Sequence, residues 1–357
     1  MITRISDDIE GYRKIEKILN NNGIVCLPTD TIYGFAVDGT NPEAIRRLHD
    51  LKKRDKKPFT FFVSRSLLQN YVIISKRKIV DYFVPGPLTV ILKKNPDGKL
   101  AVDGDNIGFR IPDLSFVINF LDYYKKPIAV TSANISGEPE LHEPKEIADR
   151  FPEIEMIIDA GPLYEKPSTV IDLTAPIPVI YRKGAVPILQ IERVYGRRIK
   201  LDPSLKFNLL FVCSGNSCRS PMAEGIIKTM IDKRYVQVRS AGTAAMDGLP
   251  ASDNARSVVN EFNGDISAHR TRYLTKEMID EADLVLVMEY KHYETVLELA
   301  PNATIKTFLL KEYKRRTKYN EVSDPVGKDL EAYRNTALEM YPSLKFVAED
   351  IKRRLLT

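Results

Sequence analysis

The chain has 357 residues, of which 43% are hydrophobic and 28% charged, and its formal net charge is only +5. This length predicts two domains, because a single hydrophobic core stops growing near roughly 250–300 residues. Three cysteines are too few for a disulfide scaffold, and neither a membrane span nor a secretory signal is visible, so we expect a cytoplasmic protein with no membrane partner.

The first half of the chain mixes helical and extended patterns. Helices are predicted over 7–20, which ends at Asn21-Asn22-Gly23, and over 42–52. Apolar runs predict strands at 24–27, 59–63, 88–92, 128–131, 170–173 and 179–181. This order indicates an α/β domain.

Polar side chains lie at the ends of these apolar runs. They are Thr29, Thr31, Arg54, Arg110, Thr131, Ser132, Asn134, Ser168, Thr169 and Arg182. Hydroxyls, amides and arginines that converge from strand ends suit the recognition of carboxylate and phosphate. No Gly-x-x-x-x-Gly-Lys loop is present in this half, so a nucleotide site here is not of the Walker type.

The same residues resemble a known family, the YrdC-like threonylcarbamoyl-AMP synthases, over about residues 8–195. The motifs that carry the resemblance are Pro28 to Gly34, Lys52-x-Arg54, Pro85-Gly86-Pro87-Leu88-Thr89, Arg110, Thr131 to Gly137 and Ser168-Thr169-Val170. The resemblance implies an α/β fold on a twisted mixed sheet. It also implies that L-threonine, bicarbonate and ATP yield threonylcarbamoyl-AMP and pyrophosphate, a step toward threonylcarbamoyladenosine in tRNA.

The resemblance also assigns roles to single residues. By the motif match, threonine is held by Thr31, Arg110, Ser132 and Ser168, whereas ATP is held by Lys52, Arg54, Asn134 and Arg182. Mg²⁺ is expected to accompany ATP, with no dedicated protein metal site. tRNA-modification proteins and double-stranded or transfer RNA are the expected macromolecular partners of this half.

Two positions depart from the family pattern. Val63 stands where members with a C-terminal extension carry a histidine, and Lys183 stands where they carry a proline. The alternative is therefore that this half is a non-catalytic module that binds nucleotide or RNA.

The boundary between the halves is predicted between 183–187 and 203–206. We expect the first domain to cover 1–190, a charged linker to cover 191–205, and the second domain to cover 206–357.

Strands and helices alternate regularly in the second half. Strands are predicted at 207–212, 236–240, 284–288 and 305–308, with helices at 221–233, 251–262, 291–299 and 330–355. This order predicts a doubly wound parallel sheet, with ligands bound at the carboxyl ends of its strands.

The octapeptide Cys213-Ser214-Gly215-Asn216-Ser217-Cys218-Arg219-Ser220 joins the first of these strands to its helix. A Gly/Asn/Ser turn before a helix presents backbone N–H groups that bind a phosphate dianion. The same groups and Arg219 favour a thiolate, so Cys213 is expected to be ionised near neutral pH and to attack phosphorus. Asp324, in Asp324-Pro325, can supply the proton that the leaving group needs.

These residues and Ser240-Ala241-Gly242-Thr243 resemble the low-molecular-weight protein tyrosine phosphatases from about Phe207 to the C-terminus. The resemblance implies that Cys213 is the nucleophile, Arg219 clamps the phosphoryl oxygens and Asp324 is the general acid. It further implies that Ser220 stabilises the thiolate and that Asn216 holds the loop, supported by Ser240 and His269. No cofactor is expected for this half.

The phosphoprotein substrate stays open between phosphotyrosine and phosphoarginine. The chain has no Trp, Val326 follows Asp324-Pro325, and Met246 stands where the family often has an aromatic wall. Ser217 resembles the hydroxyl-bearing loop of bacterial protein-arginine phosphatases. Arsenate reduction is excluded, because it needs relay cysteines and none follows Cys218. A regulatory protein that senses nucleotide or phosphate without turnover is the competing class for the whole chain.

Overall fold

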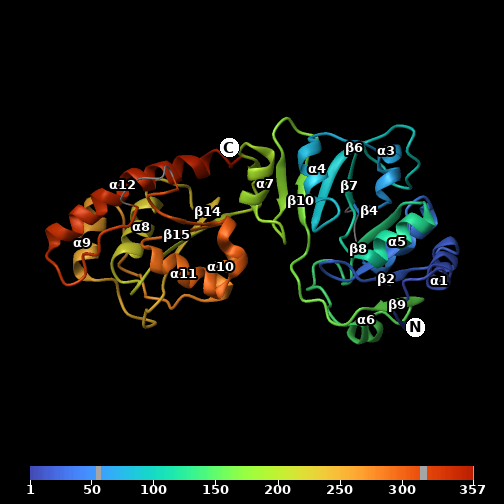
Figure 1. The fold of residues 1–357 in the computed structure, drawn as a ribbon, viewed down its shortest axis with the longest axis horizontal. Helices are drawn as coiled ribbons and strands as arrows, with labels where there is room; N and C mark the ends of the chain where they lie inside the picture. The colour runs from blue at the N-terminus through green and yellow to red at the C-terminus, as the bar shows by residue number, and fades with distance from the viewer. Residues whose placement is uncertain (54–57, 314–319, 357) are drawn as a thin grey trace. The chain divides into compact units, whose positions relative to one another are not determined.

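The computed structural model describes residues 1–53, 58–313 and 320–356. These residues form two compact units, Met1–Val186 and Pro187–Thr357, each with its own sheet and core (Figure 1). Among the described helices, none combines the length and the apolar character that a membrane span requires.

The segment expected as a linker, 191–205, is folded. It contains most of α7 (Ile188–Tyr195) and the short strand β12 (Lys200–Leu201), both in the second unit. Ile191, Ile199 and Leu201 are buried. The charged residues of the segment suggested exposure in the sequence, but the apolar residues between them are buried.

The first unit is built on a mixed sheet with strand order β1-β9-β2-β3-β8-β4-β7-β6-β10-β11 and with β5 beside β6. The strands are β1 (Ile2–Arg4), β2 (Val25–Leu27), β3 (Gly34–Asp38), β4 (Thr60–Phe62), β5 (Val72–Ile73), β6 (Leu88–Lys94), β7 (Asn106–Arg110), β8 (Ile128–Ser132), β9 (Met156–Asp159), β10 (Thr169–Asp172) and β11 (Val179–Arg182). The sheet contains parallel pairs such as β4 with β7 and antiparallel pairs such as β3 with β8, which confirms the mixed sheet.

Two helices of the first unit begin at side-chain caps and bury one face. Asp8 caps α1 through the N–H of Gly11, and Asn41 caps α2. The helices are α1 (Ile9–Asn20), α2 (Pro42–Leu51), α3 (Leu68–Tyr71), α4 (Arg77–Phe83), α5 (Ser115–Tyr124) and α6 (Pro144–Arg150). α1 and α5 pack on the face of β2, β3, β8 and β9 to form a core.

The second unit has a parallel sheet in the order β14-β13-β15-β16. Its strands are β13 (Phe207–Cys213), β14 (Val236–Gly242), β15 (Leu284–Val287) and β16 (Thr307–Leu309). Its further helices are α8 (Arg219–Lys228), α9 (Asp253–Glu261), α10 (Lys276–Glu281), α11 (Tyr290–Leu299) and α12 (Leu330–Lys352). Figure 1 shows α8, α9 and α12 on one side of this sheet and α10 and α11 on the other, so the predicted doubly wound fold is confirmed.

Candidate active sites

The loop from Cys213 to Cys218 lies at the carboxyl end of β13, an inner strand of the second sheet. β13 pairs with β14 on one side and β15 on the other, which is the position where doubly wound sheets bind ligands. α8 begins at Arg219, so its N-terminal N–H groups point toward the loop. Gly242 passes close to the loop, because a Cβ atom there would lie 2.4 Å from the carbonyl oxygen of Ser214.

Asn216 holds the loop in shape. Its backbone is left-handed, with φ at 52°, a conformation that asparagine tolerates better than most residues. Its Nδ2 donates to the hydroxyls of Ser220 and Ser240, each at 2.9 Å, and its Oδ1 accepts the N–H of Arg272 at 2.9 Å. His269 Nε2 lies 2.9 Å from the carbonyl oxygen of Asn216. The structure therefore brings Ser240 and His269 to Asn216.

The sulfur of Cys213 is buried at the base of this loop. Its Sγ lies 3.0 Å from the Ser220 hydroxyl and accepts the N–H of Asn216 at 3.3 Å. Burial raises the pKa of the Cys213 thiol, although the hydrogen bonds from Ser220 and Asn216 and the charge of Arg219 lower it in part. Ionisation of Cys213 near neutral pH therefore stays a prediction, and the charge of Arg219 is also shared with two carboxylates.

Those carboxylates belong to Glu289 and Asp324. Arg219 is buried, and its Nη1 donates to Glu289 Oε1 and its Nη2 to Asp324 Oδ2, both at 2.5 Å. Nη1 also donates to the carbonyl oxygen of Val322 at 3.2 Å. Glu289 was not predicted, although an acidic residue just beyond the end of β15, at the carboxyl edge of the sheet, was a signal that could have found it.

A histidine that the sequence analysis also missed fixes the first residue of the loop. His292 Nδ1 accepts the N–H of Glu289 at 3.1 Å, so its Nε2 carries the proton and donates to the Ser214 hydroxyl at 2.9 Å. Burial lowers the pKa of His292 to about 4, which keeps the imidazole neutral at pH 7. Ser214 is thereby held from the side of α11.

The other loop residues differ in their exposure to solvent. Gly215 is exposed and Ser217 half-buried. The buried Cys218 has its Sγ 3.2 Å from the hydroxyl of Tyr333 and 3.6 Å from the hydroxyl of Ser252.

The first unit contains a cleft of about 510 Å³ between its polar strand ends. A volume of this size is typical of small-molecule sites. Six of the predicted binding residues line the cleft: Lys52, Arg110, Ser132, Asn134, Ser168 and Arg182. Thr31 is buried and does not line it, and Arg54 lies outside the described residues.

One cluster in the cleft surrounds Lys52, which is almost completely buried. Its Nζ donates to the carbonyl oxygen of Ser132 at 2.7 Å and to Asn134 Oδ1 at 2.6 Å. The Ser132 hydroxyl donates to the same Asn134 oxygen at 2.7 Å, and Asn134 Nδ2 donates to the carbonyl oxygen of Glu138 at 2.6 Å. These contacts fix the loop after β8 and hold a cation beside it.

A second cluster surrounds Ser168. Arg182 donates from Nε to the Ser168 carbonyl oxygen and from Nη2 to its hydroxyl, both at 3.0 Å. The Thr89 hydroxyl lies 2.9 Å from that of Ser168.

Arg110, at the end of β7, is another cation that lines the cleft. It donates from Nε to the carbonyl oxygen of Gly86 at 3.2 Å and from Nη2 to Asp30. Burial lowers the pKa of Arg110, Asp30 raises it, and the charge of Arg182 lowers it further. In the part of the chain that the structure describes, Lys52, Arg110 and Arg182 are cations that line one cleft, which suits an anionic ligand.

Two positions that depart from the family pattern do not line the cleft. Val63 is fully buried in the core, and Lys183 is half-exposed just after β11. Among the described residues, no group of three or more His, Cys, Asp and Glu side chains could hold a metal ion.

Comparisons with known proteins agree with the first unit. The family model described as "Telomere recombination", which carries the names Sua5, YciO and YrdC, matches residues 17–184. A protein of Methanocaldococcus jannaschii provisionally named a threonylcarbamoyl-AMP synthase is 36% identical over 184 residues, which are 50% of this chain and 87% of that protein. The crystal structure of the Pyrococcus abyssi Sua5 protein complexed with L-threonine shares the fold, with a TM-score of 0.52 and 21% identity, over 87% of this chain and 98% of that chain.

The second unit has relatives of its own. The family model of the low molecular weight phosphotyrosine protein phosphatases matches residues 208–355. A protein-arginine-phosphatase of Geobacillus stearothermophilus is 38% identical over 148 residues, which are 42% of this chain and 98% of that protein. The chain belongs to both families. It is an enzyme that joins a Sua5/YrdC-family unit to a low-molecular-weight phosphatase unit, so the fusion predicted from the sequence is confirmed.

Proposed function

We propose that the Sua5/YrdC-family unit forms threonylcarbamoyl-AMP and pyrophosphate from L-threonine, bicarbonate and ATP. The observation that supports this is one cleft in which Lys52, Arg110 and Arg182 accompany convergent hydroxyl and amide groups. Cations in a partly buried cleft stabilise the charge that develops when the α-phosphate of ATP is attacked. The product would pass to the proteins that modify tRNA.

Within the cleft, each substrate has its own proposed residues. Arg110, Ser132 and Ser168 bind threonine. Thr31 supports this site indirectly, because its hydroxyl lies 3.0 Å from the hydroxyl of Thr29 and stabilises the turn that contains both residues. Lys52, Asn134 and Arg182 bind ATP, together with Arg54 on sequence grounds.

Mg²⁺ fits this cleft as a companion of the triphosphate. Mg²⁺ is usually held by phosphate oxygens and one or two carboxylates, and Glu138 and Glu140 both line the cleft. When bound, it would neutralise charge on the leaving pyrophosphate.

The test of this proposal is threonine-dependent release of pyrophosphate from ATP by the full chain. Release that needs both threonine and bicarbonate supports the synthase. Saturable binding of ATP without any release would favour the alternative, a module that binds nucleotide or RNA without catalysis.

For the phosphatase unit we propose hydrolysis of a phosphorylated protein side chain through Cys213. The observation that supports it is the convergence of Cys213, Arg219 and Asp324, which come from β13, α8 and the loop before α12. The thiolate attacks phosphorus and forms a sulfur–phosphorus bond while the bond to the leaving atom breaks. Ser220 and the N–H of Asn216 stabilise the sulfur charge that this attack requires.

Asp324 and Arg219 must change partners during this reaction. Arg219 exchanges its carboxylate contacts for phosphoryl oxygens, which it can hold with two parallel N–H bonds. Protonated Asp324 then gives its proton to the leaving nitrogen or oxygen, and afterwards takes one from the water that cleaves the phosphocysteine.

Phosphoarginine is the substrate that the site supports best. Met246 and Val326, the positions where aromatic rings would favour phosphotyrosine, are exposed and not aromatic, and Ser217 offers a small hydroxyl to a guanidinium. The relative from Geobacillus stearothermophilus supports the same choice. A substrate panel of phosphoarginine, phosphotyrosine and phosphoserine peptides tests it, and faster turnover of phosphotyrosine would favour the second candidate.

A further inference from the structure

We propose that Asp30 binds the α-ammonium group of the amino-acid substrate next to Arg110, so that the two residues together select a zwitterion. This inference rests on the proposed threonine site and adds a residue that determines its specificity. Asp30 lies between two threonines that the sequence analysis singled out, but it was not itself predicted as a site residue.

A rigid turn places Asp30 beside Arg110. It lies between β2 and β3, where the Thr29 hydroxyl oxygen accepts the N–H groups of Thr31 and Ile32, both at 3.1 Å. The same hydroxyl donates to the carbonyl oxygen of Ile32 at 2.7 Å. Such a turn fixes the backbone of the residue inside it. The turn thus positions the Asp30 carboxylate next to Arg110, whose Nη2 donates a hydrogen bond to Asp30 Oδ1.

The other oxygen of the same carboxylate, Oδ2, has no hydrogen-bond partner in the described part of the chain and is inaccessible to water. An unpaired buried acceptor loses its hydration without compensation, so such atoms are uncommon in folded proteins. An atom of this kind beside a ligand cleft is explained if a ligand supplies the missing donor.

The charges of Asp30 and Arg110 are complementary to the ammonium and carboxylate groups of an amino acid. Arg110 lines the cleft, and its Nη1 makes no hydrogen bond that the described residues reveal, which leaves donors for a carboxylate. Asp30 does not line the cleft itself, but its side chain is 12% exposed and its terminal torsion is a soft, two-fold one. Thr29 and Arg110, which contact Asp30 through the chain and through the ion pair, do line the cleft, and the proposal requires a rotation about that bond when the ligand binds.

The rival explanation is that Asp30 only orients Arg110. The two roles differ in what they recognise: an ammonium acceptor affects ligands that carry an amino group, whereas an orienting residue affects every carboxylate ligand. A pair of ligands that differ only in the amino group therefore separates them. L-threonine and 3-hydroxybutyrate, which is threonine without its amino group, are such a pair.

The experiment is calorimetric titration of the full chain with both ligands, in the wild type, Asp30→Asn and Asp30→Glu. In the wild type we expect 3-hydroxybutyrate to bind about 10- to 100-fold more weakly than L-threonine, the range for one hydrogen bond to a charged group. Asp30→Asn should weaken L-threonine by a similar factor and 3-hydroxybutyrate by less than about twofold. Asp30→Glu keeps the acceptor and should recover part of the affinity.

Asp81→Asn is the matched control, because it removes a carboxylate from an exposed ion pair with Arg65 in the same unit. It should change neither affinity. Equal weakening of both ligands in Asp30→Asn, or no change in either, would overturn the inference while leaving the threonine site intact. Wild-type protein that binds no L-threonine would overturn the proposed substrate as well. If Asp30→Asn does not fold, Asp30→Glu takes its place: weakening of L-threonine alone supports the inference, whereas equal weakening of both ligands, or equal affinity of the wild type for both, overturns it.

Discussion

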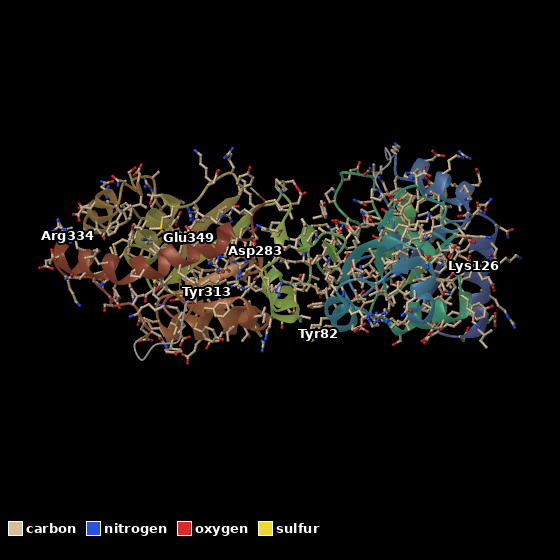
Figure 2. The ribbon with its side chains drawn as sticks, turned by 90° about the horizontal axis from the view of Figure 1, so that it is seen from above. Tyr82, Lys126, Asp283, Tyr313, Arg334 and Glu349 are labelled. Atoms are coloured by element: carbon tan, nitrogen blue, oxygen red, sulfur yellow. The ribbon has the colours of Figure 1, made fainter. Side chains whose placement is uncertain are left out.

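Arg354 and Glu192, which are 162 positions apart in the sequence, form a buried ion pair with two hydrogen bonds. Arg354 donates from Nε to Glu192 Oε1 at 2.9 Å and from Nη2 to Oε2 at 2.8 Å. Asp350 accepts from Arg354 Nη1 at 2.7 Å, and Tyr313, labelled in Figure 2, donates to Asp350 at 2.6 Å. The network joins α7 to the end of α12, so α7 is part of the phosphatase unit.

Glu192→Ala should destabilise the phosphatase unit by about 3–5 kcal/mol, because it leaves part of the buried Arg354 charge without its partner. Glu261→Ala is the matched control. It removes an equally bidentate pair with Arg334, labelled in Figure 2, but that pair is 41% exposed on both sides, so solvent screens it and its loss should destabilise the unit far less. Urea unfolding, monitored by the loss of phosphatase activity, measures the stability loss of each variant. Similar losses in the two variants would contradict the role assigned to α7.

Cys213→Ser should abolish phosphatase turnover and leave pyrophosphate release unchanged. Loss of a covalent nucleophile costs several orders of magnitude in rate, and the synthase cleft belongs to the other unit. Parallel assays of both activities on one preparation provide the measurement. Retention of more than about 1% of the phosphatase rate would rule out Cys213 as the nucleophile.

Asp324→Asn should slow substrates with poor leaving groups by roughly 10²–10⁴-fold and affect an activated aryl phosphate much less, because only the former need a proton. Glu289→Gln is the control, since Glu289 contacts the same guanidinium of Arg219. Its effect should not depend on the leaving group. Equal losses on both substrates in Asp324→Asn would show that this carboxylate only positions Arg219.

Arg110→Ala and Arg182→Ala should weaken different substrates of the synthase. Truncation of one partner of a charge-assisted pair costs about 2–5 kcal/mol, so the apparent KM for threonine should rise in the first variant and that for ATP in the second. Initial rates measured at varied concentrations of each substrate separate the two effects. If both variants raise the same KM, the assignment of residues to the two ligands is wrong.

Peroxide should inactivate the phosphatase reversibly in the native protein and irreversibly in Cys218→Ser. A thiol close to an oxidised Cys213 can trap the sulfenic acid as a disulfide before further oxidation. Cys218 must first leave Tyr333, whose hydroxyl lies 3.2 Å from its sulfur. Recovery with a thiol reductant and mass spectrometry of the oxidised protein test this. Sulfinic Cys213 without a bridge to Cys218 would contradict it.

Both folds and much of each site could be read from local patterns. The alternation of apolar runs with helical segments predicted the parallel sheet, and the spacing of Cys213 and Arg219 around a Gly/Asn turn predicted the loop at the end of β13. α5 was not predicted. Its buried residues include adjacent pairs such as Phe116 with Val117 and Phe120 with Leu121, so its apolar positions do not form a narrow helical stripe in the sequence. The linker was predicted from the charged residues of segment 191–205. The sequence does not show whether a charged side chain is exposed or forms a buried ion pair, as Glu192 does.

The sequence by itself determined the two families and predicted the residues that we propose carry their chemistry, because motifs at strand ends are local in the chain. The tertiary structure decided which distant charges meet. Glu289 reaches Arg219, Asp30 reaches Arg110 and Glu192 reaches Arg354 only after the strands and helices have packed. Each of these pairs joins residues at least 70 positions apart, and no periodicity in a single segment reports a contact over such a distance.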